Sequence, residues 1–495
     1  MSILIIGLNT ISSFELYDKV RSEEDMLTYV FQPESGKPLY EQLYSFIRKD
    51  IEIGKLKSGE QLPSKRKLSA HLKVSVITVE GAYGQLLAEG YIRSKARCGF
   101  FVQPLLVGER KKNSPKSEQF PVPQRKGYHA HPEREYDFAT NAVDTDYFPF
   151  SSWAKLMRQV LWEDKLLEAT EPQGLYELRQ TIVRHLYEFR GMSAEPEQIV
   201  VGAGSEYLTG LLVQLLGREK GYGVENPGYH KIRSIFQKNG AEVFHISMDE
   251  LGLNVENLRQ SGANVAHVMP SHHFPLGIVM PAARRMELLH WASEVSGRYI
   301  IEDDYDSEFR FSGRPIPALQ RLDQNEKVIY MNTFAKSLAP SLRIGYMVLP
   351  PHLTRRYQDE FMFYASTVPI FEQMTLARFM ERGHFERHIG RMRNVYKTRR
   401  DALISAAAGS SLGECFQFSG EDAGLHLLLS VKNGMTEQEL VSRASKDNIG
   451  VYGLSGYYAV PDENMPKSTL VLGYARLRAK AMGPAFERLA NIWRN

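Results

Sequence analysis

Strand-like and helical stretches alternate beyond residue 136 of this 495-residue chain, and no other feature constrains its fold as strongly. The strand-like runs are short and rich in β-branched and aromatic residues: 199–201, 221–224, 243–246, 265–269, 299–301 and 328–331. Longer stretches with helical periodicity separate them, as the crossovers between parallel strands require. The alternation therefore predicts a domain of the α/β class over residues 136–495, doubly wound around a mainly parallel sheet.

A different order of elements is predicted for residues 37–103, where three helices precede a hairpin. The helices are expected at 38–54, 64–72 and 75–89, and the strands at 91–93 and 99–102. Ser64 and Ser75 are natural N-caps, and Gly90 lies where a glycine commonly ends a helix. These residues are predicted to form a small separate domain.

Segments of different composition flank this small domain. Residues 104–135 are dominated by Lys, Arg, Ser, Pro, Gln and Gly, and they have too few large apolar side chains for a core, so they are predicted to be a linker. Residues 1–36 form an N-terminal extension, of which 1–25 resemble no part of the small domain. Met26 is therefore a candidate for the true first residue.

Composition excludes several classes of protein. A hydrophobic content of 43% is enough for a core in each of two or three domains. Cys98 and Cys415 lie far apart without a Cys/His cluster, so neither a disulfide framework nor a metal site is expected. No apolar run approaches the roughly 20 residues that span a bilayer, and the first residues lack the features of an export signal. We therefore expect a cytoplasmic protein without a membrane partner.

Basic side chains are concentrated in the small domain. The whole chain carries 61 Lys and Arg against 58 Asp and Glu, whereas residues 37–97 carry twelve against six. A solvated helix face also produces such a run, and for a basic run alone it is the commoner cause. The helices and hairpin that surround this cluster favour a module that neutralises DNA phosphates.

Two segments of the small domain carry a family resemblance: Leu62-Pro63-Ser64-Lys65-Arg66-Lys67-Leu68-Ser69 and Val74-Ser75-Val76-Ile77-Thr78-Val79. They resemble the L-P-S-x-R-x-L-A and V-S-x-x-T-V patterns of the GntR family, whose fold is a winged helix-turn-helix. The resemblance implies a domain that binds double-stranded operator DNA. The residues implied in this contact are Ser64, Arg66, Ser75, Ile77 and Thr78 on the helices, and Lys95 and Arg97 in the wing.

The implied DNA contacts differ in kind. Ser75 and Thr78 would present hydroxyls from the start of the recognition helix, and Arg66 would hold the phosphate backbone. The basic residues of the wing would enter an adjacent minor groove. Many family members carry arginines where this chain has Val76 and Glu80, so the operator of a relative does not transfer to this chain.

Motifs of the large domain would suit a pyridoxal 5'-phosphate site. Such a site needs an amine for a Schiff base, a carboxylate facing the pyridine nitrogen, a donor to the ring hydroxyl and a phosphate cup. The segments Thr333-Phe334-Ala335-Lys336-Ser337 and Ser341-Leu342-Arg343 resemble motifs of fold-type I aminotransferases. The resemblance implies that Lys336 forms the Schiff base, and that Thr333 and Arg343 hold the phosphate.

Upstream motifs supply the remaining groups. Asp303 and Tyr305 follow an apolar strand, at the edge where open α/β sheets bind ligands, and would face the pyridine nitrogen and the ring hydroxyl. The segment 201–206 resembles the turn in which the amides of Ser205 and Glu206 meet the phosphate at a helix N-terminus. Tyr229, after Asn226-Pro227-Gly228, would stack on the ring, although an ordinary turn explains this segment almost as well.

The combination of both halves in one chain resembles the MocR/GabR subfamily of GntR regulators. It implies a homodimeric transcription regulator that binds pyridoxal phosphate and is not an enzyme. Three positions depart from related patterns. Phe274 replaces an asparagine that bonds the ring hydroxyl in aminotransferases, and Lys231 and Gly456 replace arginines that would bind an amino-acid carboxylate.

These three departures indicate which ligand the regulator is predicted to sense. Each group of pyridoxal phosphate has a candidate partner in the chain, whereas an amino-acid carboxylate lacks both arginines. The chain is therefore predicted to sense pyridoxal phosphate and to control vitamin B6 synthesis or salvage, as one branch of the subfamily does. Two alternatives stay open: an amino-acid-responsive regulator of amino-acid metabolism, and a working aminotransferase with an attached DNA-binding domain.

Overall fold

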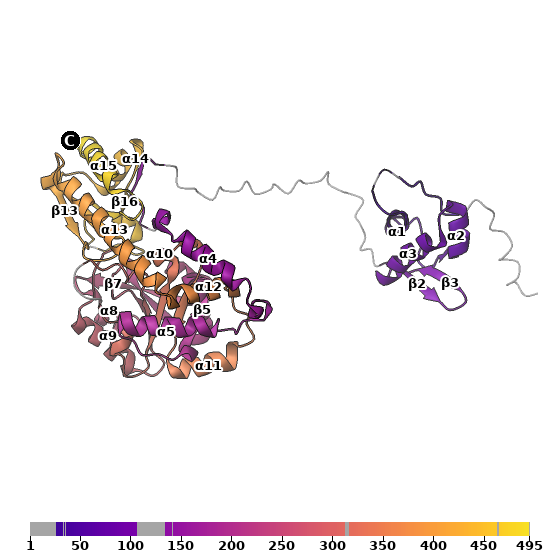
Figure 1. The fold of residues 1–495 in the computed structure, drawn as a ribbon, viewed down its shortest axis with the longest axis horizontal. Coiled ribbons are helices and arrows are strands. Elements are labelled where there is room, and N and C mark those ends of the chain that lie inside the picture. Colours follow the sequence, from indigo (N-terminus) through magenta and orange to yellow (C-terminus); the bar gives the residue numbers. More distant parts are fainter. Residues whose placement is uncertain are drawn as a thin grey trace, which may run out of the picture. The chain divides into compact units, whose positions relative to one another are not determined.

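A computed structural model of the protein describes residues 26–32, 34, 36–105, 134–140, 142–311, 316–462 and 465–494 (Figure 1). The chain divides into two compact units, residues 1–128 and 129–495. Residues 1–25 of the predicted extension and most of the predicted linker 104–135 lie outside the described residues. Within the described ranges, no helix is both long and apolar enough to cross a bilayer.

The small unit, indigo in Figure 1, contains three helices and a three-stranded sheet of order β1-β3-β2. The helices are α1 (Leu39–Glu52), α2 (Lys65–Leu72) and α3 (Val76–Ala88), and the strands are β1 (Gln61–Leu62), β2 (Ile92–Lys95) and β3 (Gly99–Val102). Both predicted N-caps are present, because Ser64 accepts a hydrogen bond from the amide of Lys67 at 3.3 Å and Ser75 from that of Thr78 at 3.1 Å. Lys73 adopts a left-handed conformation with φ 54° and turns the chain from α2 into α3.

The hairpin of the small unit differs from its prediction in two details. β2 begins at Ile92 and extends to Lys95, so this lysine belongs to a strand and the turn is formed by residues 96–98. β1 was not predicted: Gln61 and Leu62 pair with β3, far along the chain, and no local pattern announces such a contact.

Large apolar side chains fill the core of the small unit. Its fully buried members include Leu43, Ile47, Leu68, Val79 and Leu86, as the helical spacing of these residues requires. The arm before α1 extends this core, since Leu27, Tyr29 and Phe31 pack against it. The Tyr29 hydroxyl donates to Asp50 at 2.9 Å. The described part of the predicted extension is therefore attached to the small unit.

An eight-stranded sheet of order β5-β12-β11-β10-β9-β6-β7-β8 forms the centre of the large unit. The strands are β5 (Ile199–Gly202), β6 (Gly221–Asn226), β7 (Glu242–Asp249), β8 (Gly252–Leu253), β9 (Val265–Val268), β10 (Tyr299–Asp303), β11 (Val328–Thr333) and β12 (Gly345–Val348). All six predicted strands are present. β8 and β12, which were not predicted, pair antiparallel with their neighbours, and the sheet is mainly parallel as expected.

Helices cover both faces of this sheet. On one face Val200, Ile301 and Ile329 pack against α6, α7 and α11, and on the other face alternate residues such as Val201 and Ile300 pack against the remaining layer. The helices of the large unit are α4 (Phe150–Val160), α5 (Tyr176–Arg190), α6 (Ser205–Leu216), α7 (His230–Lys238), α8 (Val255–Gln260), α9 (Ala282–Glu294), α10 (Phe334–Ser337), α11 (Pro351–Phe361), α12 (Ile370–Glu381), α13 (His384–Ala408), α14 (Glu437–Lys446) and α15 (Ala479–Ile492). The domain is doubly wound.

A second, four-stranded sheet belongs to the C-terminal part of the large unit, where α13, α14 and α15 lie near the C-terminus in Figure 1. Its order is β13-β14-β17-β16, and its strands are β13 (Phe416–Ser419), β14 (His426–Val431), β16 (Tyr452–Gly453) and β17 (Thr469–Gly473). A separate pair joins β4 (Tyr136–Asp137) to β15 (Ile449–Gly450), which ties the start of the unit to this part. None of these strands was predicted.

The topology brings several strand ends to one edge of the central sheet. β10 and β11 are parallel, and β12 runs antiparallel to both β11 and β5, so β5 has the same direction as β10 and β11. Gly202, Asp303 and Thr333 are the last residues of these three strands. Ligands of open α/β sheets bind beyond this carboxyl edge.

Candidate cofactor site and nucleic-acid interface

A cavity of about 230 Å³ lies at this carboxyl edge. Its walls contain all eight residues that the sequence predicted for the cofactor: Ser205, Glu206, Tyr229, Asp303, Tyr305, Thr333, Lys336 and Arg343. They come from five separate segments of the chain, so their meeting in one cavity is a property of the fold. Thr140, Phe274, Asp306 and His426 also line the cavity, and the sequence analysis did not propose them as cofactor ligands.

Lys336 lies on the short helix α10, directly after the end of β11. The pKa of its amine is lowered to about 8, mainly by burial; the carboxylate of Asp306 opposes this shift, and the charge of Lys231 adds to it. A lysine in water has a pKa near 10.4 and is almost fully protonated at neutral pH. The cavity therefore increases the share of Lys336 that carries a lone pair and can attack an aldehyde carbon.

The opposite wall of the cavity has the form of an anion cradle. α6 begins at Ser205 after Gly204, whose φ of 87° is in the region that favours glycine. A Cβ at Gly204 would lie 2.7 Å from Nη2 of Arg343, so only glycine leaves the arginine its position. Amides of the first helical turn have no intrahelical partner and are suited to a phosphate.

Glu206 adds a side chain to this cradle, although only its backbone amide was predicted to act there. Its carboxylate accepts a short hydrogen bond from Arg343 and another from Lys231 Nζ at 3.2 Å. Burial raises the pKa of Glu206, but the hydrogen bonds from the two cations outweigh this effect and lower it. One carboxylate thus connects the arginine and the lysine at the mouth of the cavity.

Asp303 and Tyr305 lie beside histidines. Asp303 is buried, and its carboxylate is 3.4 Å from Nε2 of His267. The Tyr305 hydroxyl is 3.3 Å from Nδ1 of His272. Phe274, which stands where aminotransferases have an asparagine, packs edge-on against Tyr229 with 5.7 Å between ring centroids. The hydroxyl of Tyr305 therefore has an imidazole partner, while the position of the asparagine is apolar.

The histidine beside Tyr305 belongs to a buried cluster that the sequence analysis missed. His272 Nδ1 lies 2.9 Å from a carboxylate oxygen of Asp306, and the ring of His426 lies 4.7 Å from that of His272. Nε2 of His426 lies 3.1 Å from the carbonyl oxygen of Pro275. The three residues are far apart in sequence, and their only local signal was the pair of adjacent histidines at 272 and 273.

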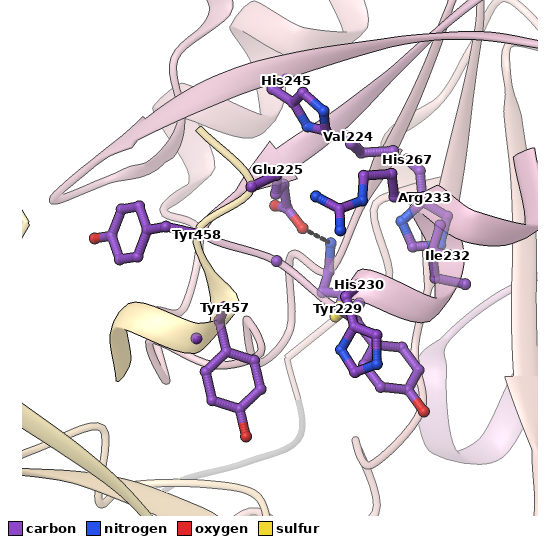
Figure 2. A pocket seen from close by; sticks show the side chains of 14 residues that line it. Val224, Glu225, Tyr229, His230, Ile232, Arg233, His245, His267, Tyr457 and Tyr458 are labelled. Atoms are coloured by element: carbon purple, nitrogen blue, oxygen red, sulfur yellow. Dashed lines mark hydrogen bonds between the residues drawn. The ribbon is translucent and has the colours of Figure 1, made fainter. Parts of the chain in front are cut away.

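Thr333 and Tyr229 complete the wall. The Thr333 hydroxyl accepts from the amide of Ala335 at 3.2 Å and donates to the carbonyl of Ile344 at 3.3 Å, so it caps α10. Tyr229 directly precedes α7, without a side-chain capping hydrogen bond, and also lines a second cavity of about 30 Å³. Figure 2 shows this second cavity, where Tyr457 and Tyr458 of the C-terminal segment lie beside residues of α7 and the buried Glu225.

The larger cavity fits pyridoxal phosphate in its donors and its shape. A nucleophilic amine, a buried carboxylate and a phenol converge on it, and Gly204 opens a space beside an arginine at a helix N-terminus. When bound, the cofactor would supply an aldehyde and an electron-withdrawing ring. The residues of the chain hold and orient it, and the pKa of Lys336 sets the pH range in which the amine reacts.

The candidate DNA-contacting residues lie on the surface of the small unit. Ser64, Arg66, Ser75, Ile77, Lys95 and Arg97 are exposed, and Thr78 is half-buried. The hydroxyl of Thr78 lies 2.8 Å from that of Ser75, so the two share one hydrogen bond at the start of α3. Arg97 has a positive φ of 62° at the tip of the hairpin.

Two known families match the chain. The family "Bacterial regulatory proteins, gntR family" matches residues 39–102, and "Aminotransferase class I and II" matches residues 134–459. Among solved structures, the kynurenine aminotransferase of Pyrococcus horikoshii in complex with PMP is 26% identical, with a TM-score of 0.62 over 72% of this chain and 90% of that one.

Regulatory proteins resemble the chain over both units. YdeL of Bacillus subtilis, an uncharacterized HTH-type transcriptional regulator, is 38% identical and covers 92% of this chain and 97% of its own. MocR of Rhizobium meliloti, a probable rhizopine catabolism regulatory protein, is 31% identical and covers 94% of this chain and 95% of its own. PdxR of Corynebacterium glutamicum, an HTH-type pyridoxine biosynthesis transcriptional regulator, is 31% identical and covers 87% of this chain and 91% of its own.

Fold, site and relatives together identify the protein as a transcription regulator. It joins a winged helix-turn-helix domain to a domain of aminotransferase fold that binds pyridoxal phosphate. The chain belongs to the MocR/GabR subfamily of GntR regulators. The predictions of family, fold class and cofactor are thereby confirmed.

Proposed function

We propose that pyridoxal phosphate is itself the signal that this regulator senses, and that the protein controls genes of vitamin B6 synthesis or salvage. The observation that carries the proposal is the set of cations in the cavity. Among the described residues that line it, the only arginine is Arg343, at the anion cradle, and the lysines are Lys231 and Lys336. The cradle suits a phosphate, and Lys336 suits an aldehyde.

An amino-acid effector would not find a matching set of binding groups in this cavity. Its carboxylate would need a paired donor inside the cavity, because burial of an unpaired carboxylate costs several kcal/mol. Lys231 does not reproduce the planar fork of an arginine, and it shares the carboxylate of Glu206 with Arg343. Gly456 lines the second, smaller cavity and brings no charge. These features argue against an amino-acid effector.

The proposed roles of the site residues follow from their places in the cavity. Lys336 forms the covalent link, Asp303 faces the pyridine nitrogen and Tyr305 donates to the ring hydroxyl. Arg343 with the amides of Ser205 and Glu206 binds the phosphate, Thr333 fixes the start of α10, and Tyr229 stacks on the ring. The same lack of a carboxylate fork supports a protein without transaminase activity, because an aminotransferase must bind the carboxylates of an amino acid and then of a 2-oxo acid.

The proposal of a vitamin B6 regulator is supported by one relative. PdxR, which is named as a regulator of pyridoxine biosynthesis, is 31% identical over 87% of this chain. We also propose a cytoplasmic homodimer, in which the large units associate. Large apolar side chains exposed on that unit support association, since Trp162 is 89% and Leu167 97% exposed.

The test is a titration of operator binding against pyridoxal phosphate. The full-length protein and a DNA fragment from upstream of its own gene are used at fixed salt, because the affinity for DNA depends on salt. Pyridoxal without its phosphate is the matched control for the anion cradle. In parallel, γ-aminobutyrate and alanine are added at a fixed saturating concentration of pyridoxal phosphate.

We expect pyridoxal phosphate alone to change operator affinity by about 5- to 150-fold, the usual range of coupling between two sites. Pyridoxal should act only at much higher concentration, and the amino acids should add nothing. A change caused by an amino acid at saturating cofactor, with none caused by the cofactor alone, would contradict the proposal and favour the amino-acid-responsive alternative.

A further inference from the structure

The outer face of α3 is apolar where the helix begins. Ile77 is 79% exposed and Val76 is 43% exposed, whereas the other large aliphatic residues of α3 are buried (Val79 and Leu86) or partly buried (Leu87). These two residues are in the first turn of the second helix of a helix-turn-helix. In such domains this turn contacts base edges in the major groove.

α3 also lacks the basic side chains that most often read guanine. Between Ser75 and Glu89 the chain has no Lys or Arg, so this helix cannot make the bidentate arginine contact to guanine. Its two acids are engaged within the unit, since Glu80 pairs with Lys65 at 2.5 Å and Glu89 accepts a hydrogen bond from Tyr44. The side chains that extend outward at its start are therefore aliphatic.

The same face of α3 continues with two glycines, Gly81, where a Cβ would lie 3.3 Å from the Tyr40 side chain, and Gly84. Gly84 lies seven residues after Ile77 and so on the same side of the helix. A Cβ at Gly84 would meet no atom within 4 Å, which means that the core does not require a glycine there. A glycine inside a helix destabilises it by about 1 kcal/mol relative to alanine. Its smooth surface would let the helix backbone approach the groove closely.

We infer that Ile77, supported by Val76, reads thymine methyl groups, so that the operator half-site presents thymines to the start of α3. The C5-methyl of thymine is the one apolar group that a base pair of A·T type offers in the major groove. Exposed basic residues of α2 and the wing, such as Arg66, Lys67, Lys95 and Arg97, then bind phosphates and fix the helix in the groove. The inference rests on the DNA-binding role of this domain.

The experiment removes the methyl group and nothing else. Full-length protein is used to select its preferred duplex from a random library, and each thymine of that duplex is then replaced by deoxyuridine in turn. Binding is measured by fluorescence anisotropy at one salt concentration. Burying one methyl stabilises an interface by about 0.8 kcal/mol, so we expect about fourfold weaker binding at each thymine that Ile77 or Val76 contacts.

Variants identify the residue that senses the methyl. Ile77→Ala should bind the thymine and uracil duplexes equally well, and Ile77→Val should show an intermediate difference. Ile53→Ala is the matched control, because Ile53 is an exposed isoleucine of the same unit, 61% accessible, at the end of α1. That variant should keep both the affinity and the fourfold difference.

Two results would overturn the inference: uracil duplexes that bind wild-type protein as well as thymine duplexes at every position, or an Ile77→Ala protein that keeps the full difference. Failure to select any sequence would contradict the DNA-binding role itself, and the inference with it. Should Ile77→Ala unfold the domain, as circular dichroism would show, the Ile77→Val variant decides in its place.

Discussion

Lys336 and the acid beside it illustrate how single residues tune the site. Burial lowers the pKa of the lysine to about 8, and Asp306 opposes this shift while contacting His272 at 2.9 Å. A more exposed lysine would be protonated at neutral pH, and a lysine without Asp306 would be a weaker base. The carboxylate therefore controls how much of the amine is reactive at a given pH.

Replacing Lys336 by alanine tests the covalent link. Lys336→Ala should lose the visible absorbance band of the bound cofactor while the protein stays folded, because no other residue is proposed to form the imine. Lys231→Ala is the control, since Lys231 is the other lysine that lines the cavity outside α10, and it should keep the band. A band that persists in Lys336→Ala after borohydride and dialysis would show that the assignment is wrong.

The pH dependence of cofactor capture follows from the same pKa. Only the unprotonated amine reacts, so the initial rate should rise about tenfold per pH unit below 8 and level off above it. Since Asp306 raises the pKa of Lys336, Asp306→Asn should move the midpoint to lower pH. Stopped-flow absorbance between pH 6 and 9 measures both midpoints. An unchanged or higher midpoint in the variant would refute this role of Asp306.

At the scale of elements, we expect α2, α3 and the hairpin to make different kinds of contact with DNA. Arg66 is exposed on α2, whereas Thr78 is half-buried at the start of α3 and shares a hydrogen bond with Ser75. An exposed arginine without a base edge in reach acts on phosphates alone. Arg66 should therefore contribute to binding of any DNA, and Thr78 mainly to binding of the operator.

Arg66→Ala should weaken binding to operator and random DNA alike, and it should reduce the slope of log affinity against log salt by about 1. Thr78→Ala should weaken mainly the operator complex, and Thr78→Ser, which keeps the hydroxyl, should restore most of it. Affinities at four or five salt concentrations separate the two effects. Equal losses on both kinds of DNA for Arg66→Ala and Thr78→Ala would contradict this division.

The elements that could be predicted from the sequence are those with short-range signals. Ser64, Ser75 and Gly90 mark helix ends within a few residues of the chain, and six of the eight strands of the central sheet were predicted from compact apolar runs. β1 was missed because it forms only by pairing with a distant segment. β14 and β17 were missed although 427–429 and 470–472 are apolar runs of the same kind as those of the central strands. The two-residue strand β1 has no pattern of its own without β3.

At the scale of the whole molecule, the candidate site also combines residues that local motifs predict with contacts that only the fold reveals. Motifs identified eight of the residues that line the cavity, because most of them lie at the end of a strand or near the start of a helix. The ion pairs of Glu206 with Lys231 and Arg343, and the cluster of His272, were not predicted, since they join segments that only the complete fold brings together.

The arm before α1 gives a prediction about the start of the chain. Removing residues 1–25 should leave operator affinity and stability unchanged, because among the described residues the arm packs on the core through Leu27, Tyr29 and Phe31. Removing residues 1–32 also deletes Tyr29 and Phe31, which pack on Phe46, and should destabilise the small unit by roughly 2 kcal/mol. Urea denaturation and operator binding of both truncated proteins provide the test. A large loss of binding on removing 1–25 alone would contradict it.

The central claim is that one chain couples a cofactor cavity to an operator-binding domain. Coupling of this kind is reciprocal: if the cofactor changes the affinity for DNA by some factor, DNA must change the affinity for the cofactor by the same factor. The direct measurement is therefore the dissociation constant of pyridoxal phosphate, determined with and without saturating operator duplex. We predict a change equal to the change in operator affinity caused by the cofactor, and none with a scrambled duplex. Identical cofactor affinities in the presence and absence of operator would contradict the account.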